Sequence, residues 1–155
     1  MKSHLMKDEN SLLVDKARRL ANFCYENRFD GIDVLMGVKI SQMARIYDGI
    51  GPDFDASVVL KILRHMNPLF EPAGFLQDIA YRLETDRSRE NFHRVNLDFW
   101  HNCIRCVKLK YSFLNPKRYY LIWISARKLW GASDEYGWNT WLSRGKRQGG
   151  NNECF

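Results

Sequence analysis

The sequence lacks any long run of apolar residues, and its first ten residues are mostly polar and charged. A membrane-spanning helix needs about 20 consecutive apolar residues, and a secretory signal needs a continuous apolar centre. The sequence therefore predicts a chain without a membrane span that is made and folded in a cytoplasm.

Cysteine is also scarce, and the four residues are Cys24, Cys103, Cys106 and Cys154. In a reducing cytoplasm they are expected to be thiols rather than disulfides. Cys103 and Cys106 lie about one helical turn apart on an apolar stripe, where cysteine behaves as a small hydrophobe. A zinc site at this pair would need two further ligands, and His93 and His101 point elsewhere on the same helix. The spacing therefore favours buried thiols over a metal site.

Motifs of zinc fingers, RNA-recognition sheets and single-strand-binding barrels are absent as well, although the formal net charge is +6 and the pI is about 9.2. Lysine and arginine occur in several separate segments. Dispersed positive charge is typical of a solvated surface or of a site for an acidic partner. Non-specific contact with nucleic acid is the alternative interpretation of the same charge.

What the sequence does contain is the composition of one globular domain, with 155 residues of which 45% are hydrophobic. This length supports one core but is short for two. We predict a mainly α fold, a compact single-domain bundle of five to six helices with little or no strand. Apolar residues recur with the helical period in five segments: 11–28, 56–66, 72–84, 89–109 and 116–130.

Capping and breaking residues set the predicted boundaries. Ser11 is a plausible cap of the first helix, Pro68 is expected to separate the second helix from the third, and Gly131 is expected to end the last one. The domain is predicted to cover residues 1–142. Residues 143–155 are rich in Gly, Asn, Lys and Arg, so they are predicted to form a flexible basic tail.

Two of the predicted helices carry a polar residue where their apolar face should be. Gln77 and Tyr81 lie four residues apart and share a face of one helix. Asn96 falls within the apolar stripe of the next helix, whereas Asp98 falls on its outer face. We therefore expect Gln77, Tyr81 and Asn96 to meet in the interior, between the two helices.

Two short motifs lie on these helices, Gln77-Asp78-Ile79-Ala80-Tyr81 and Val95-Asn96-Leu97-Asp98-Phe99, and a loop Tyr47-Asp48-Gly49-Ile50-Gly51 precedes them. Their order and spacing resemble the core of phospholipase A2-like folds, including the parvovirus capsid lipase, and of a family of small tailed-phage proteins. The first motif of those proteins is His-Asp-x-x-Tyr and the second is Ala-Asp-x-x-Phe. The similarity covers roughly residues 47–131.

The departures from that pattern bear on activity. In the lipases the histidine deprotonates a water molecule and an aspartate on the second helix orients it, but the matching positions here are Gln77 and Asn96. A carboxamide has no usable pKa and cannot act as a general base near neutral pH. The resemblance therefore implies a retained scaffold without catalysis, with Gln77, Asn96 and Tyr81 as a vestigial dyad and its neighbour.

We accordingly predict a non-catalytic phage protein, made in the host cytoplasm and associated with the virion as a structural or interaction subunit. The expected partners are other protein subunits, which the resemblance implies belong to a phage particle. Two alternatives stay open. One is a small basic regulator that binds nucleic acid or a host protein, and the other is a phospholipase or esterase with an unrecognised base.

A cation site is the remaining implication of the resemblance. In the lipases the aspartate after the histidine joins the loop carbonyls on calcium, and Asp78 is present here together with Tyr47, Gly49 and Gly51. Without a base, a calcium ion at this place would be structural. No other cofactor is expected.

Aromatic residues concentrate in the C-terminal third, where aliphatic residues are few after Gly131. The preceding helix, 116–130, is apolar nearly all round, which predicts that it is enclosed by its own core or by another subunit. Tryptophan and tyrosine with a basic rim are typical of an interface centre. The predicted partner-binding residues are Trp130, Tyr136, Trp138, Trp141, Arg144, Lys146, Arg147 and Phe155.

Overall fold

The structure, a computed structural model, describes residues 2–47, 57–124 and 130–146. Within these ranges the chain forms six α-helices and one 3-10 turn, and no strand, which confirms the mainly α prediction. No helix in the same ranges is long and apolar enough to cross a membrane. The elements are α1 (Lys2–Glu26), η1 (Ile32–Leu35), α2 (Ile40–Ile46), α3 (Ser57–Leu83), α4 (Arg89–Lys110), α5 (Pro116–Ile124) and α6 (Gly131–Lys146).

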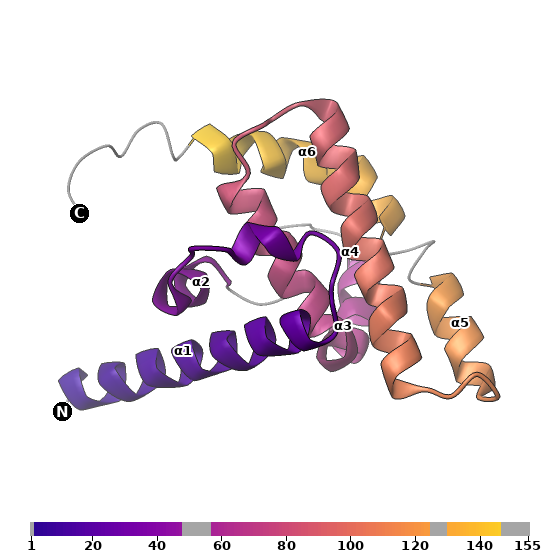
Figure 1. Cartoon of the computed structure of the whole chain (residues 1–155), viewed down its shortest axis with the longest axis horizontal. Helices are drawn as coiled ribbons and strands as arrows, with labels where there is room; N and C mark the ends of the chain where they lie inside the picture. The colour runs from indigo at the N-terminus through magenta and orange to yellow at the C-terminus, as the bar shows by residue number, and fades with distance from the viewer. Residues whose placement is uncertain (1, 48–56, 125–129, 147–155) are drawn as a thin grey trace.

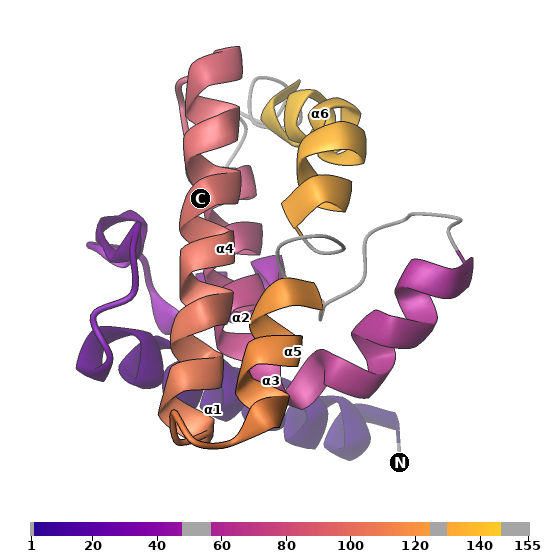
Figure 2. The same ribbon diagram turned by 90° about the vertical axis from the view of Figure 1, so that its right-hand side faces the viewer.

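The helices α3 and α4 form an antiparallel hairpin at the centre of the molecule (Figure 1). The helix α6 packs near the turn that joins them, whereas α5 lies beside the opposite end of α4 (Figure 2). On the other side, α1 crosses α3 and contacts α2. The fold therefore places the two C-terminal helices at opposite ends of α4.

The helix α3 is continuous from Ser57 to Leu83, so the prediction of two helices separated at Pro68 is wrong. Both Pro68 and Pro72 lie inside it. A proline removes one hydrogen bond and bends a helix, but the turns on either side can continue. Figure 2 shows the first part of α3 projecting to one side, while its later turns run behind α4.

Three other boundaries differ from the prediction. The helix α1 begins at Lys2, so Ser11 lies inside it rather than at its start. Gly131 begins α6 instead of ending the preceding helix, and the described part of that helix is α5, Pro116–Ile124. Helix α6 continues to Lys146, so the first residues assigned to the tail are helical. Residues 147–155 lie outside the described part of the chain.

The start of α4 and the start of α5 follow from their capping residues. The Ser88 hydroxyl accepts a hydrogen bond from the Asn91 N–H at 3.1 Å, and α4 begins at the next residue. Before α5, the Asn115 side-chain oxygen accepts from the Lys117 N–H at 3.0 Å. Each cap satisfies a backbone donor that the first helical turn leaves unpaired.

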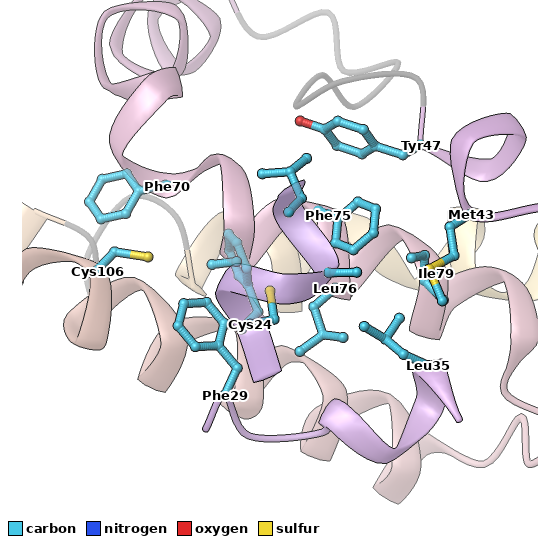
Figure 3. Packing of buried hydrophobic residues seen from close by; sticks show 14 of the residues in the cluster. Cys24, Phe29, Leu35, Met43, Tyr47, Phe70, Phe75, Leu76, Ile79 and Cys106 are labelled. Atoms are coloured by element: carbon cyan, nitrogen blue, oxygen red, sulfur yellow. The ribbon is translucent and has the colours of Figure 1, made fainter. Parts of the chain in front are cut away.

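The main core lies where α1, η1, α2, α3 and α4 meet, and Figure 3 shows its buried side chains. Phe29 from the connection after α1, Leu35 from η1 and Leu76 from α3 point toward one another. The three described cysteines, Cys24, Cys103 and Cys106, are buried free thiols, in agreement with the sequence prediction. Burial raises the pKa of the Cys24 and Cys106 thiols to about 12.

Candidate functional site

The polar centre of the molecule lies between α3 and α4. Gln77 donates from Nε2 to Asn96 Oδ1 at 3.0 Å, and the Tyr81 hydroxyl donates to the same oxygen at 2.7 Å. Asn96 is fully buried and Tyr81 is buried, while Gln77 is half-buried. The predicted meeting of these three side chains is therefore present.

The chemistry of this centre is that of neutral hydrogen bonds. One acceptor oxygen on Asn96 receives both donors, so no group in the contact is poised to take a proton from water. The Asn96 Nδ2 donor is buried, and it has no partner in the described part of the chain. The arrangement can fix the register of two helices, but its residues cannot perform general base catalysis.

A small cleft opens beside the amide contact. It is lined by polar side chains, Gln77, Glu84, Arg94 and Asp98, and by apolar ones from η1 and α3, including Val34 and Leu76. The helical period predicted Asp98 on an outer face of α4, and this prediction is wrong. Residues 30–34 fold over this part of α4 and cover the side chain. Its side chain is only 24% exposed.

Asp98 is held in the cleft by charge and by close packing. Arg94 lies 3.2 Å from Asp98 Oδ2 and bonds Glu84 at 2.9 Å through its other terminal nitrogen. Burial raises the pKa of the Asp98 carboxyl, and the positive charge of Arg94 opposes that rise. A Cβ added to Gly31 would lie 3.1 Å from Asp98 Oδ2, so the covering backbone approaches this carboxylate closely.

The segment over the cleft, residues 27–35, is fixed to α4 by two side chains. The Asn102 amide accepts from the Asp30 N–H and donates to the Asp30 carbonyl, both at 2.9 Å. Arg105 donates to the Asn27 and Arg28 carbonyls at 3.1 and 2.5 Å. These bonds satisfy backbone groups that have no helix to pair them, so the covering segment is a defined part of the site.

The proposed calcium ligands are only partly described. Tyr47 is buried and its hydroxyl donates to Glu71 at 3.0 Å. Asp78 lies half-buried on α3, and Gly49 and Gly51 lie outside the described residues. In the ranges that the structure covers, no group of three or more His, Cys, Asp or Glu side chains is placed to share an ion. Calcium binding stays a prediction of the resemblance.

Trp141 is a core residue, so its assignment to a partner surface is wrong. It is fully buried, with its ring 5.2 Å from the Tyr81 ring and 5.9 Å from the Phe92 ring between centroids. The Arg87 guanidinium lies 4.5 Å above the indole and donates to the carbonyls of Tyr81 and Trp141. These contacts attach α6 to the α3–α4 hairpin.

The other predicted partner residues have mixed positions. Trp138 is half-buried, 5.2 Å from the Phe92 ring and beneath Arg89. Trp130 is 36% exposed and lies 5.8 Å from the Trp100 ring. The remaining side chains lie outside the described ones: Tyr136, Arg144, Lys146, Arg147 and Phe155.

Exposed apolar side chains gather instead around α5 and the turn before it. We define the α5 surface as Phe113, Leu114, Tyr119, Tyr120 and Trp123, which are 65%, 77%, 60%, 59% and 57% exposed. Only Ile124 of α5 is buried, because this helix packs chiefly on α4. An apolar helix predicted to be enclosed therefore has one covered face and one uncovered face in this chain.

A charge pattern could have located this surface from the sequence. Between Phe99 and Ser133 there is no Asp or Glu, whereas seven Lys and Arg residues lie there among the aromatic ones. A long segment with aromatic residues and a single sign of charge is unusual for a plain solvated face. The helical period of apolar residues does not identify the α5 surface, because an apolar face has the same period whether it is buried or exposed.

Comparison of the chain with protein-family models, curated proteins and solved structures gives no match. The resemblance to phospholipase A2-like folds therefore depends only on the motifs around Gln77 and Asn96 and on the loop at residues 47–51.

Proposed function

We propose that this chain is a non-catalytic subunit of a phage particle that binds other proteins through the α5 surface. The observation that carries the proposal is the exposure of five large apolar side chains on α5 and the turn before it. Large exposed apolar patches are rare on monomeric soluble proteins, and they mark interaction sites. Aromatic anchors with a basic rim match the composition of protein interface centres.

The interior supports the non-catalytic part of the proposal. A hydrolase of this type needs titratable side chains at the two positions that are Gln77 and Asn96 in this chain. Both are amides here, and they hydrogen-bond to each other. Their hydrogen bonds stabilise the contact between α3 and α4 without providing a base. The phage setting comes from the motif resemblance across residues 47–131.

The test is incorporation into particles. We expect mass spectrometry of particles from cultures that carry the gene to detect the chain at a fixed ratio to the other subunits. Tyr120→Ala combined with Trp123→Ala should lower incorporation about tenfold or more, since truncated interface anchors commonly cost 2 kcal/mol or more. The control is Tyr25→Ala, which removes a 47% exposed ring from α1.

Two results would contradict the proposal. One is the absence of the wild-type chain from purified particles. The other is normal incorporation of the Tyr120 and Trp123 double variant, with thermal unfolding showing that both the variant and the Tyr25 control are folded.

A hydrolase is the second candidate, and the observation that favours it is Asp98, a partly buried carboxyl in the same cleft as Gln77. We expect no phospholipid hydrolysis, with or without calcium, because Arg94 already occupies this carboxylate. Hydrolysis that disappears in Asp98→Asn would identify Asp98 as a base. The variant Gln77→His with Asn96→Asp tests whether restoring the titratable pair restores activity.

A further inference from the structure

The α5 surface lies at one tip of the molecule, where the turn after α4 leads into α5 (Figure 2). Leu114 and Phe113 in that turn are 77% and 65% exposed, and Leu109 in the last turn of α4 is 53% exposed. The helix α6 lies at the other end of α4 and does not cover this tip (Figure 1). The position leaves the surface open to a large partner.

The net charge of the chain originates in the same place. Of 24 Lys and Arg residues, seven lie between Phe99 and Ser133, whereas all 18 Asp and Glu residues lie outside that segment. The rest of the chain is therefore close to neutral. Of the seven, Lys108 and Lys110 lie in the last turn of α4 and Lys117 and Arg118 lie on α5, whereas Arg105 pairs with Asp30 and the other two are outside the described residues.

Four cations beside the α5 surface have no acidic partner among the described residues. Lys108, Lys110 and Lys117 are exposed, Arg118 is half-exposed, and none of the four pairs with a carboxylate within the described residues. By contrast, Lys16 lies against Glu71, and Arg94 bonds two carboxylates. Unpaired cations around an apolar patch can be neutralised by a partner that brings acidic groups.

The apolar part of the surface indicates the class of that partner. Bases stack on aromatic rings, so Tyr119, Tyr120 and Trp123 alone would suit single-stranded nucleic acid. Exposed leucine side chains form no hydrogen bond with a base or a phosphate, however, and Leu114 and Leu109 are 77% and 53% exposed. A protein segment can cover both leucines and aromatic rings with its own apolar side chains.

We propose that the α5 surface binds an acidic segment of a different protein, in which Asp and Glu flank an apolar stripe. This proposal rests on the proposed function and names the chemistry of the partner. A second copy of the chain would bring the same cations to the contact, and like charges in an interface oppose association. The apolar contacts set the lifetime of the complex, while the cations increase the rate of encounter and make it sensitive to salt.

The first experiment identifies what touches the surface. The full chain carries a photo-crosslinking amino acid in place of Tyr120, and particles that contain it are irradiated and analysed by mass spectrometry. We expect crosslinks to one protein segment that contains Asp or Glu residues next to aliphatic ones. Crosslinks to nucleic acid, lost on nuclease treatment, overturn the proposal, as do crosslinks to a segment without acidic residues.

The second experiment changes the charge alone. Lys110→Glu with Lys117→Glu is compared with Arg19→Glu and Lys39→Glu, which are exposed residues on the α1 side and lower the net charge equally. We expect incorporation of the first variant to fall about tenfold, whereas the second should change less than about twofold, since charge acts at the contact. Equal effects of both variants overturn the acidic partner.

The outcomes separate this inference from the proposed function. If the Tyr120 and Trp123 variant is not incorporated but the Lys110 and Lys117 variant is, the α5 surface binds a partner and that partner is not acidic. If the wild-type chain is absent from particles, both proposals fail.

Discussion

The α3–α4 contact places polar residues inside the molecule, whereas the α5 surface places apolar residues outside it. Inside, the Asn96 side-chain oxygen accepts from both Gln77 and Tyr81, and Asn96 Nδ2 is the one polar atom of this contact that is buried without a partner in the described residues. Outside, the Trp123 and Tyr120 side chains are 57% and 59% exposed. A buried polar group that is hydrogen-bonded within the chain can be explained by packing alone. A group of large apolar side chains exposed to solvent points to a binding role. We therefore propose a structural role for the first region and a binding role for the second.

The largest expected effect sets a buried tryptophan against an exposed one. Trp141→Ala should lower the free energy of unfolding by about 3–5 kcal/mol, because it removes a fully buried ring that packs on Tyr81 and Phe92. Trp123→Ala should change it by less than about 0.5 kcal/mol, since that ring is exposed. Urea unfolding of both variants measures the difference. Similar losses in both would show that α5 is part of the core.

The next effect concerns the buried amide. Asn96→Leu should lower the free energy of unfolding by about 1–3 kcal/mol, because Gln77 and Tyr81 lose the oxygen to which both donate. Asn139→Leu is the control, since Asn139 is exposed on α6 and should be nearly neutral. Greater stability of Asn96→Leu would mean that the hydrogen bonds do not stabilise the contact between α3 and α4.

Alanine substitutions at two glycines test how closely the segment over the cleft packs on Asp98. Gly31 and Gly37 have φ values of 75° and 77°, so alanine is strained at both by about 1–2 kcal/mol. Only at Gly31 would the added Cβ also press on Asp98, because nothing lies within 4 Å of a Cβ at Gly37. We therefore expect Gly31→Ala to be the more destabilising in thermal unfolding. Equal losses of thermal stability in the two variants would mean that residues 27–35 shift to accommodate the added Cβ without a measurable cost.

The smallest effect is the pH dependence contributed by Asp98. Burial raises the pKa of this carboxyl, with Arg94 and His101 opposing the rise and Asp30 and Asp33 adding to it. The folded state therefore holds the proton to a higher pH than the unfolded state, and stability from this group is complete in acid and is lost as the pH rises through the raised pKa.

Comparison with Asp98→Asn measures that contribution. The wild type should lose more stability than the variant as the pH rises from the acidic range toward neutral, when both are unfolded in urea at a series of pH values. Glu26→Gln, at an exposed site on α1, should follow the wild type. A variant with the same slope as the wild type would show that Asp98 is not desolvated.

Sequence reasoning succeeded where one residue interrupts a clear period. The stripe of α4 is buried as predicted, and Asn96 within it could only face α3. It failed where the decision depends on tertiary contacts. The helical turns on both sides of Pro68 continue, and the place of Trp141 is decided by Arg87 and the rings around it. The burial of Asp98 also depends on residues 27–35, which have no regular period.

Competition for incorporation tests the division between interior and surface most directly. Wild type is produced together with either Asn96→Leu or the Tyr120→Ala and Trp123→Ala variant, and the ratio of the two chains in particles is divided by their ratio in the folded soluble pool. The account predicts a value near one for Asn96→Leu and a value lower by about tenfold for the surface variant. Exclusion of folded Asn96→Leu together with full incorporation of the surface variant would contradict it.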